Sequence, residues 1–559
     1  MMALSCTARW VAYGWGLVAA LAASACAPTA PPPPSPAVPG VPPAPAAAPQ
    51  PERGGIFQLA ARQPVPHLSY WREAGVAASI GLTPVYERLL VLDFQEDEDW
   101  REHYRVVPWL AERWEQPDPR TYVFQVRKGI KWHDGADLTA RDVEWAYKEL
   151  LDPKNAFRGG ANLKLAETIQ AIDESTLRIR VVEQSAIFLV GLADRNSMIQ
   201  PRHVVERGQK HEDVAIGTGP YKVASFDRQK GLDLVRNDLY WQGGAKPYLD
   251  KVKIVWGMDV AGMFAAFQAK QSDVLKVIDK VQFDQVKALS PQVKSRVFLR
   301  DLVDSFWMRV DRPPFQDVRV RQAVHLGIDR QQLVNVVTFG LGLANPPEVN
   351  GGRRGWVIPQ DELKTLPGWR QPKDEDIAEA RRLLSQAGYG DGLKIVNRYN
   401  LTQSTTPQES EILAQQLKKI GIDMELQPME RVVFEKAFRE GDFEVSVESG
   451  VGYAPERDWN DRIHSKGAGN GFGINDPELD RPIEAQAVEL DEKRRQQLFL
   501  EIQRLGLRKM YVIPLISPVN FTLWHPWVHG WIDNYAGQAA NQEWSQLWVS
   551  REQAPKDRS

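Results

Sequence analysis

Alternating apolar and polar positions predict strands in several short stretches of the chain. Residues 121–135 (TYVFQVRKGIKWHDG) alternate with a period of two and end in a polar turn. Residues 175–183 (STLRIRVVE) and 251–257 (KVKIVWG) show the same alternation with β-branched side chains. These patterns are typical of half-buried β-strands.

A period of three to four residues predicts helices between these strands. In residues 138–153 (LTARDVEWAYKELLDP), Thr139 and Asp142 have the spacing of a capping box, and Pro153 follows the last turn. Residues 376–392 (DIAEARRLLSQAGYGDG) predict a helix that begins with acidic side chains and stops at Gly388. Residues 412–428 (ILAQQLKKIGIDMELQP) predict a helix, a glycine turn and a strand. The apolar face of the first helix consists of Val143, Ala146, Tyr147 and Leu150.

The length and composition of the chain indicate a large α/β protein with more than one core. Its 559 residues exceed what a single hydrophobic core usually organises, and strand and helix patterns alternate along it. The net charge of −3 argues against nucleic acid as a partner, because nucleic-acid-binding proteins usually carry a strong basic excess. No internal apolar run has the length of a membrane-spanning helix.

The first 25 residues predict a secretory signal peptide. The apolar stretch WVAYGWGLVAALAASA follows Arg9, and small residues precede Cys26. The sequence AASAC resembles a bacterial lipobox, in which the cysteine is acylated and becomes the mature N-terminus. Ala23 stands where such sequences usually have leucine. A plain signal peptide cleaved nearby is the alternative.

The cysteine count favours the acylated form. The chain has two cysteines, Cys6 and Cys26, and Cys6 lies in the segment expected to be removed. A mature body without cysteine can form no disulfide and no thiolate metal site. The proline-rich residues 26–53 then act as a semi-rigid spacer between a lipid anchor and the folded body.

Motifs of the common enzyme classes are absent from the sequence. It contains no G-x-S-x-G elbow, no phosphate-binding loop, no H-E-x-x-H and no C-x-x-C. His525 and His529 are four apart, but Pro526 opposes the helix that would bring them to one metal. The glycine-rich residues 467–473 (GAGNGFG) indicate a loop, and His133 indicates a strand-end turn with a local side-chain hydrogen bond. We therefore expect no enzyme activity, no metal and no cofactor.

Six stretches, in order along residues 54–530, together resemble the peptide-type solute-binding receptors of ABC importers, solute-binding protein family five. The stretches are PVYERLL (84–90), VPWLAERWEQPDPRTYVFQVRKGIKWHDGADLTARDVEWAY (107–147), GTGPYKVASFDRQKGLDLVRNDLYW (217–241), PPFQDVRVRQAVHLGIDRQQLV (313–334), ARRLLSQAGYGDGLKI (380–395) and NDPELDRPIEAQAVELDEKRRQQLFLEIQRL (475–505).

The resemblance implies an α/β, two-lobed periplasmic-binding-protein fold of type II, with an extra subdomain inserted in lobe I. Two chain crossings form its hinge, which we expect near Leu302–Asp304 and Pro514–Ser517. The expected organisation is a signal peptide (1–25), a lipid-anchored Pro/Ala-rich linker (26–53), lobe I (54–303), lobe II (304–515) and a return to lobe I with a C-terminal tail (516–559).

The sequence departs from the family pattern at the expected ligand site. Peptide-binding members carry an aspartate in a D-Y-x-x-P sequence that anchors the amino group of the peptide. In SGVGYAPERDW (449–459), Tyr453 matches, but Gly452 stands at the aspartate position. Either Asp458 or Glu448 replaces the anchor, or Asp458 only caps a loop. Trp459 completes this group of predicted ligand-binding residues.

Two further positions are candidate ligand contacts. Arg309 stands where the family usually has asparagine, close to the hinge. It could bind an anionic group of the ligand or pair with a neighbouring carboxylate. Gly75 occupies the place of a glycine whose backbone contacts ligand in dipeptide receptors, although glycine there could also only shape a turn.

The resemblance implies a bacterial extracytoplasmic receptor that captures a short peptide or peptide-like solute between its lobes. Its expected partners are the solute, the permease subunits of an ABC importer and, through Cys26, a membrane; we expect a periplasmic or cell-surface monomer. A non-peptide solute such as an oligosaccharide or a metal chelate is the alternative within the class. A secreted enzyme, or a scaffold used for signalling or adhesion, is the alternative outside it.

Overall fold

The computed structural model describes residues 49–72, 76–93, 105–155, 157, 159–276, 279–300, 302–347, 355–403, 405–451, 459–531 and 544–558. Residues Pro51–Ser559 form one compact unit, separate from Met1–Gln50. The predictions for the signal peptide and Cys26 lie outside the described residues. So do those for Gly75, Gly452, Tyr453 and Asp458.

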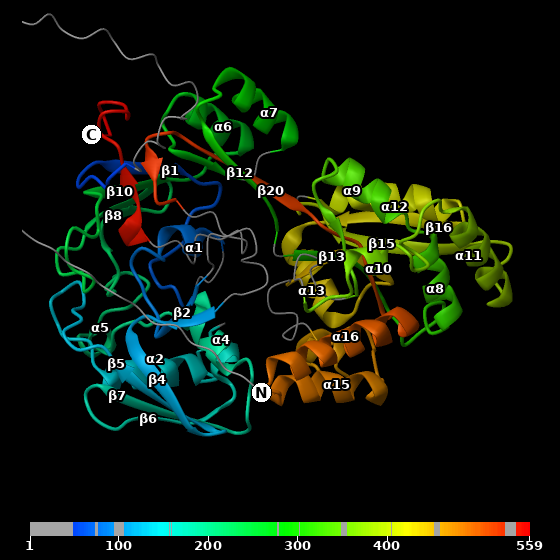
Figure 1. The fold of residues 1–559 in the computed structure, drawn as a ribbon, viewed down its shortest axis with the longest axis horizontal. Coiled ribbons are helices and arrows are strands. Elements are labelled where there is room, and N and C mark those ends of the chain that lie inside the picture. Colours follow the sequence, from blue (N-terminus) through cyan, green and yellow to red (C-terminus); the bar gives the residue numbers. More distant parts are fainter. Residues whose placement is uncertain are drawn as a thin grey trace, which may run out of the picture. The chain divides into compact units, whose positions relative to one another are not determined.

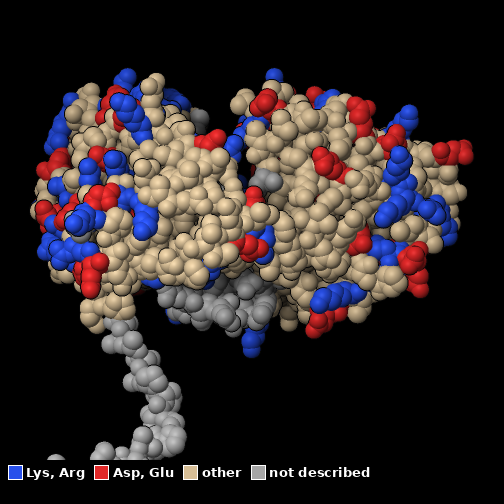
Figure 2. Space-filling model, turned by 90° about the horizontal axis from the view of Figure 1, so that it is seen from above, with Lys and Arg blue, Asp and Glu red and all other residues tan. Residues whose placement is uncertain are grey.

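The surface carries charges of both signs. Lys and Arg side chains are interspersed with Asp and Glu side chains over the face seen in Figure 2, as the net charge of −3 leads one to expect. Among the helices that the structure describes, none is both long and apolar enough to cross a bilayer.

A seven-stranded mixed sheet forms the centre of the first lobe, with the order β12-β20-β11-β1-β10-β9-β8 (Figure 1). The central strand β1 pairs in parallel with β10 and β11. Inside and outside positions alternate along β1, so that Phe57 and Leu59 are buried in the core. The strands are β1 (Ile56–Ala60), β8 (Tyr221–Asp227), β9 (Gly231–Arg236), β10 (Lys251–Val255), β11 (Val274–Lys276), β12 (Lys294–Leu299) and β20 (Val519–Trp524).

A four-stranded antiparallel sheet, in the order β4-β5-β7-β6, follows in the chain and has a hydrophobic core of its own. The helix α2 (Ala140–Leu151) packs on it through the apolar face that the sequence predicts. The predicted capping box is present, because the Asp142 carboxylate accepts hydrogen bonds from the backbone N–H and the hydroxyl of Thr139. The strands are β4 (Ala111–Asp118), β5 (Thr121–Val126), β6 (Ala166–Ala171) and β7 (Thr176–Val181).

Shorter elements complete the first lobe, which we call lobe I. The helices are α1 (Val76–Gly81), α3 (Gly160–Leu163), α4 (Phe188–Ala193), α5 (Arg202–Glu206), α6 (Val260–Gln268) and α7 (Lys280–Leu289), with 3-10 turns η1 (Arg195–Ser197) and η4 (Trp544–Gln546). The two-stranded pairs are β2 (Leu90–Asp93) with β3 (Arg105–Pro108), and β21 (Val528–His529) with β22 (Trp548–Val549).

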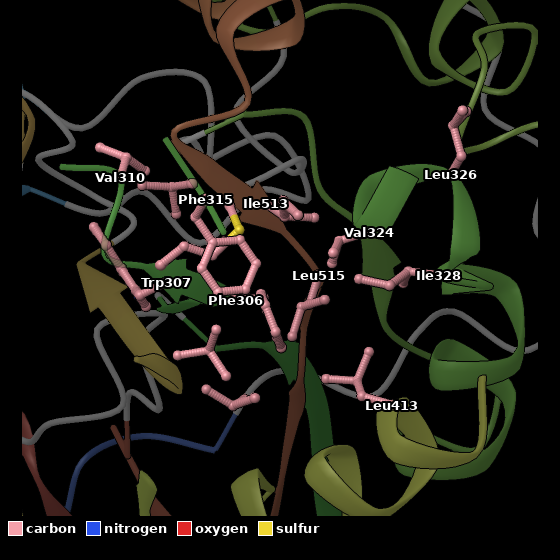
Figure 3. Close-up of a cluster of buried hydrophobic side chains, with 14 of the residues drawn as sticks. Phe306, Trp307, Val310, Phe315, Val324, Leu326, Ile328, Leu413, Ile513 and Leu515 are labelled. Atoms are coloured by element: carbon pink, nitrogen blue, oxygen red, sulfur yellow. The ribbon is translucent and has the colours of Figure 1, made fainter. Parts of the chain in front are cut away.

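The second lobe, lobe II, is built on a five-stranded sheet with the order β16-β15-β17-β13-β18. Its core joins the apolar strand β13 to the helices around the sheet; Figure 3 shows Phe306, Trp307 and Leu413 in this cluster. The strands are β13 (Leu302–Met308), β15 (Leu393–Asn400), β16 (Ile422–Met429), β17 (Val445–Val451) and β18 (Val512–Pro514), and a separate pair joins β14 (Leu343–Ala344) to β19 (Ile516–Ser517).

The helices of lobe II include two that the sequence predicts. The helix α11 begins with acidic residues at Asp374 and is followed by Gly388, whose φ of +90° is the left-handed conformation that ends helices. The helix α12 leads through Gly421 into β16, as predicted. The helices are α8 (Val318–Gly327), α9 (Arg330–Val337), α10 (Gln360–Leu363), α11 (Asp374–Gln386), α12 (Thr406–Lys418), α13 (Arg431–Glu440), α15 (Pro477–Val488) and α16 (Glu492–Lys509), with a π-helical turn η2 (Trp459–Ile463).

The predicted strand at residues 121–135 is shorter in the structure. The strand β5 ends at Val126, and Gly129 and Gly135 adopt positive φ values of +78° and +90° that form turns. Lys131, between these glycines, makes only an isolated bridge with Asp137, which follows the second one. The alternation continues past Val126 because Ile130 and Trp132 are buried core residues of the turn region, not because they continue the strand.

The chain passes between the two large sheets at two places that are hydrogen-bonded to each other. It leaves β12 at Leu299 and enters β13 at Leu302, and it returns between β18 and β20. The backbone N–H of Arg300 donates to the carbonyl of Pro518 (2.7 Å), and that of Leu515 to the carbonyl of Asp304 (2.8 Å). The two connections therefore run side by side.

Candidate ligand-binding site

A group of polar side chains lies on lobe II beside the first crossing. Asp304 is the only ionisable residue in the apolar strand β13, and it is 1% exposed. Thr405 donates a 3.1 Å hydrogen bond from Oγ1 to Asp304 Oδ2, and the Ser449 hydroxyl donates to Oδ1. Gln403 in turn donates to the Ser449 hydroxyl (2.6 Å). These bonds tie β13, β17 and the segment before α12 together at one carboxylate.

Glu409 faces the same group from the first turn of α12. Its side chain is fully buried, and neither carboxylate oxygen has a hydrogen-bond donor among the residues that the structure describes. Burial raises the pKa of Glu409 well above its usual range, and the charge of nearby Asp304 raises it further. Two carboxyl groups in contact can form a hydrogen bond only when one of them is protonated. Both effects favour the neutral, protonated form of Glu409 beside Asp304.

Glu448 is a third carboxylate of this region, on β17. Its Oε2 atom is buried and has no hydrogen-bond partner among the described residues, whereas the side chain as a whole is only half-buried. Burial raises the pKa of Glu448 to about 7. The positive charge of nearby Arg462 lowers this pKa, and the negative charge of Asp304 raises it. A carboxylate with such a pKa exchanges its proton readily at neutral pH.

Two arginines supply positive charge around these three carboxyl groups. Arg300, at the first crossing, interacts electrostatically with Asp304 and Glu409, and burial lowers its pKa. Arg462 faces Glu448, and its guanidinium carbon lies 5.7 Å from the ring centroid of Trp307. We call Asp304, Glu409 and Glu448 the carboxylate cluster. Among the described residues, the three carboxyl groups of the cluster thus lie near two guanidinium groups.

Asp304 and Glu409 were not among the residues predicted from sequence. A carboxylate in the otherwise apolar run LVDSFWM (302–308) is a visible signal for Asp304, because strands buried on both faces rarely carry a charge. Glu409 resembles an ordinary first-turn acid at a helix N-terminus, and only the fold shows that it is buried.

Arg309 is engaged by its neighbours in the structure. Its Nε and Nη2 donate to the two carboxylate oxygens of Asp311 at 3.0 and 2.7 Å, and Nη1 donates to the carbonyl of Gly441. The Arg309 side chain is 13% exposed. Arg309 thus pairs with a neighbouring carboxylate, which is one of the two roles expected from the sequence. The other role, contact with an anionic group of the ligand, stays a prediction.

Trp459 is fully buried in the core of lobe II. Its ring packs edge-on against Phe499 at 4.6 Å between centroids. Its indole N–H has no partner among the described residues. Residues 452–458, which include Gly452, Tyr453 and Asp458, lie outside the described residues, as does Gly75, so these predicted contacts stay predictions.

A buried carboxylate of lobe I, Glu87, joins several segments of that lobe. Glu87 is 5% exposed and accepts hydrogen bonds from the Thr218 hydroxyl (2.8 Å), Trp109 Nε1 (2.8 Å), the Tyr240 hydroxyl (3.1 Å) and Trp241 Nε1 (3.1 Å). Burial raises the pKa of Glu87 to about 7, although all four donors favour the charged form. With its acceptor atoms occupied by neutral structural groups, Glu87 is a scaffold residue.

The weaker motifs of the sequence have structural roles. His133 lies in a turn, but its ring contacts distant backbone: Nδ1 accepts from Gly217 N–H (3.2 Å) and Nε2 lies 3.0 Å from the Gly219 carbonyl. The predicted local side-chain hydrogen bond comes instead from Asp134, which accepts from the backbone of Ala136 at 3.3 Å. Residues 467–473 form a loop, as predicted.

The two histidines of HPWVH have separate surroundings. His525 stacks on Phe267 and Trp527, and His529 stacks on Trp548 at 3.9 Å between centroids. In the described part of the chain, no group of three or more His, Cys, Asp or Glu side chains is arranged to hold a metal ion. The rings of His525 and His529 are thus each part of an aromatic stack.

Comparison with known proteins places the fold and the order of motifs in one family. A family model described as bacterial extracellular solute-binding proteins, family 5, matches residues 105–470. Two curated relatives are each 23% identical. They are the periplasmic oligopeptide-binding protein OppA of Escherichia coli (82% of this chain, 86% of the relative) and heme-binding protein A of Haemophilus influenzae (78% and 83%).

Solved structures share the fold over nearly the whole described chain. The periplasmic binding protein DppA of Helicobacter pylori, in complex with the peptide STSA, aligns with a TM-score of 0.72 and 19% identity. The alignment covers 89% of this chain and 98% of that one. The α/β, two-lobed fold of type II predicted from the sequence is thereby confirmed.

Proposed function

Because this chain belongs to the bacterial extracellular solute-binding proteins of family 5, we propose that it is the receptor of an ABC importer for a short peptide or peptide-like solute. Solute binding, not catalysis, is the property that defines the family. In this proposal the solute lies between lobes I and II, and the receptor delivers it to the permease subunits in the membrane.

The pair of hydrogen-bonded crossings carries this proposal. Within the described residues, only the connections at Arg300 and Pro518 lead from one large sheet to the other, and a backbone hydrogen bond joins these two connections. A short two-stranded connection lets two rigid lobes rotate while each keeps its own core. We place the hinge at these crossings, with lobe I before the first and after the second.

A peptide is the favoured solute because relatives over most of the chain are an oligopeptide-binding protein and a protein solved with a bound peptide. Glu448 and Ser449 lead directly into the segment where the family's amine anchor is expected. Tyr453 keeps the family residue there, and Glu448 or Asp458 is the proposed replacement for the missing aspartate.

One observation favours a non-peptide solute as the second candidate. Gly452 removes the carboxylate that peptide-binding members use, and a relative of similar identity is named for binding heme. A changed anchor position changes which solute group can be recognised, since a buried charge-assisted hydrogen bond contributes strongly to specificity.

The proposed location is the outer face of a membrane. Cys26 would carry the lipid, and residues 26–53 would hold the folded body at a distance from the bilayer while it remains near the permease. The folded body would act as a monomer. It would contact the permease only when the lobes have closed on the solute.

Thermal unfolding of the purified protein with a panel of solutes tests the function. The panel contains trialanine, N-acetyl-trialanine, maltotriose, a nickel–histidine chelate and haemin. A ligand present at about 100 times its Kd stabilises the native state by about 2.7 kcal/mol. Stabilisation by trialanine supports the peptide receptor, and stabilisation by haemin or maltotriose alone assigns a different solute. A panel without any stabilising solute contradicts the receptor proposal for these classes.

A further inference from the structure

The two lobes also contact each other away from the crossings. In lobe I, the segment between β7 and α4 reaches the C-terminal end of α15 in lobe II, and Figure 1 shows α4 beside α15. The backbone N–H of Ala186 donates to the carbonyl of Ala487 at 2.9 Å. Gln184 Nε2 donates to the carbonyl of Val488 at 2.7 Å. Among the described residues no strand pairing joins the lobes at this place, so these hydrogen bonds depend on the relative position of the lobes.

The acceptors in this contact are carbonyl groups that a helix leaves without donors of its own. The last four carbonyls of an α-helix have no N–H partner within the helix. The helix α15 ends at Val488, and the backbone is extended at Glu489. In lobe II itself, Arg495 Nε donates to the carbonyl of Gln486 at 3.2 Å. Within the described residues, the donors to the next two carbonyls, of Ala487 and Val488, come from lobe I.

The donating segment is held in place by lobe I. The carbonyl of Ser185 accepts a hydrogen bond from the Tyr122 hydroxyl at 3.3 Å, and the Ser185 hydroxyl accepts one from the backbone N–H of Ile187 at 3.3 Å. Ser185 is 5% exposed, and Tyr122, on β5, is 1% exposed. Because Ser185 is fixed to the core of lobe I, its two neighbours Gln184 and Ala186 present their donors to lobe II from a defined position.

The contact is built for reversible use. Gln184, Ala186 and Ala487 are half-buried, and Val488 is 36% exposed, so water reaches all four when the lobes separate. Water then replaces each lost partner, and the net contribution of each hydrogen bond is modest. Two such bonds therefore shift an equilibrium between joined and separated lobes without making the joined state permanent.

We propose that Gln184 and Ala186 of lobe I, together with the carbonyls of Ala487 and Val488, form a latch that holds the two lobes together and thereby sets how tightly the receptor retains its solute. The proposal rests on the solute-receptor function proposed above. The latch consists only of protein groups, so it acts through the share of molecules in which the lobes are joined.

This mechanism predicts an effect that is independent of solute chemistry. The apparent affinity of a receptor is its intrinsic affinity reduced by the fraction of molecules in the binding-competent state. Loss of the latch should therefore raise the Kd of every solute held between the lobes by one common factor. A residue that contacts solute directly would instead change the affinities of different solutes unequally.

Distances between two nitroxide labels test the latch without any added solute. Val182→Cys and Leu490→Cys place the labels two residues outside the latch on lobe I and lobe II, at side chains that are each 50% exposed. Cys6→Ser and Cys26→Ser remove the other two cysteines of the chain. Double electron–electron resonance on the purified full chain should give a short distance from joined lobes and a longer one from separated lobes.

Two replacements of Gln184 should shift this distribution toward the longer distance. Gln184→Ala removes one hydrogen bond, so the ratio of short to long distances should fall roughly three- to tenfold. Gln184→Glu should lower it further, because an ionised carboxylate cannot donate and would face the negative end of the α15 dipole. A wild-type distribution without the short distance, or one that neither variant changes, overturns the latch.

Gln125→Ala is the matched control. Gln125 is also a half-buried glutamine of lobe I, and its Nε2 donates to a backbone carbonyl at 3.1 Å, but the acceptor, Ser175, belongs to the same lobe. This variant should keep the wild-type distances. A fall in the short distance as large as that in Gln184→Ala would show that any lost glutamine contact loosens the lobes, and would overturn the specific role of Gln184.

Solute affinity separates the latch from the proposed function. For each of trialanine, maltotriose and haemin that the wild type binds, calorimetric titration of Gln184→Ala should show a Kd raised by the factor by which the joined share falls. An unchanged Kd despite a smaller joined share overturns the control of affinity by the latch. If the wild type binds none of the three, the receptor proposal fails for these solutes, and the label distances still decide whether the latch holds the lobes.

Discussion

Thr218 donates a 2.8 Å hydrogen bond from its hydroxyl to Glu87, although the two residues are 131 positions apart. Trp109, Tyr240 and Trp241 donate to the same carboxylate. All five residues lie in three of the stretches by which the chain resembles its family: Glu87 in residues 84–90, Trp109 in residues 107–147, and the other three in residues 217–241. The motifs of lobe I thus meet at one buried side chain, which indicates that they mark scaffold and not ligand.

Replacement of Glu87 by alanine should destabilise the protein strongly. Two indole N–H groups would lose their acceptor in a buried site, and a cavity would remain. We expect a loss of roughly 2–5 kcal/mol in the free energy of unfolding, measured by urea denaturation. Glu115→Ala, at a side chain that is 71% exposed, should change stability by less than about 0.5 kcal/mol. Similar losses in both variants would contradict the role given to Glu87.

Stability should also depend on pH through Glu87. Its folded-state pKa of about 7 lies above the ordinary glutamate value, so between these two values the native state binds more protons than the unfolded state. The contribution of Glu87 to stability therefore falls as the pH rises from about 4.5 to above 7. Between pH 5 and pH 8, the wild-type protein should therefore lose about 3 kcal/mol of unfolding free energy relative to Glu87→Gln. A difference that stays constant across this range would show that Glu87 titrates normally.

In lobe II, Arg330 should be essential for the second crossing. It is 2% exposed, stacks on Trp369 at 4.4 Å, and donates to the carbonyls of Pro514 (2.7 Å) and Gly368 (2.8 Å). Lysine cannot reproduce this planar fork. Arg330→Lys should lower the free energy of unfolding by roughly 2–4 kcal/mol and speed amide exchange near Pro514.

The control for this variant is Arg382→Lys, because Arg382 is 54% exposed and pairs only with Glu379 on its own helix among the described residues. It should leave both stability and exchange nearly unchanged. Unaltered exchange near Pro514 in Arg330→Lys would show that the arginine does not support the crossing.

Local patterns predicted the elements well where a short segment decides its own structure. The capping box at Thr139 and Asp142 and the glycine stop at Gly388 depend on neighbours within four residues, and both are present. The strand at residues 121–135 was predicted too long, because buried turn residues such as Trp132 produce the same alternation as a strand. His133 was expected to bond locally and instead contacts residues more than 80 positions away.

The candidate site was less predictable for a related reason. Glu448 was identified because it adjoins the family's anchor position. Glu409 has the sequence context of any first-turn acid, and its burial is decided by the packing of α12 beside β13 and β17. Similarly, tryptophan is a residue type that often stacks on ligands, yet the ring of Trp459 lies in the core of lobe II against Phe499. Long-range packing, which a local pattern does not encode, separates these cases.

Membrane attachment should depend on one atom, the sulfur of Cys26. Cys26→Ser removes the acceptor for the lipid without altering the folded body, so the variant should move from the membrane pellet to the soluble fraction. Cell fractionation with immunoblotting measures this distribution. Cys6→Ser, at the other cysteine, should leave the protein on the membrane. Retention of Cys26→Ser in the pellet would contradict the lipid anchor.

Arg309 either supports the fold through Asp311 or binds the solute, and measurements of stability and of solute affinity separate these two roles. Its guanidinium makes a two-point contact with Asp311, and such bidentate pairs are stronger than single contacts between exposed charges. If the residue is structural, Arg309→Gln should lower the free energy of unfolding by roughly 1–3 kcal/mol and leave solute affinity unchanged.

A double-mutant cycle with Asp311→Asn completes the test of Arg309. The losses from the two single variants should exceed that of the double variant by the coupling energy of the pair, about 1 kcal/mol or more. If Arg309 instead binds an anionic group of the solute, Arg309→Gln should weaken binding while Asp311→Asn does not. Additive losses in stability together with weakened solute binding would assign Arg309 to the ligand and not to Asp311.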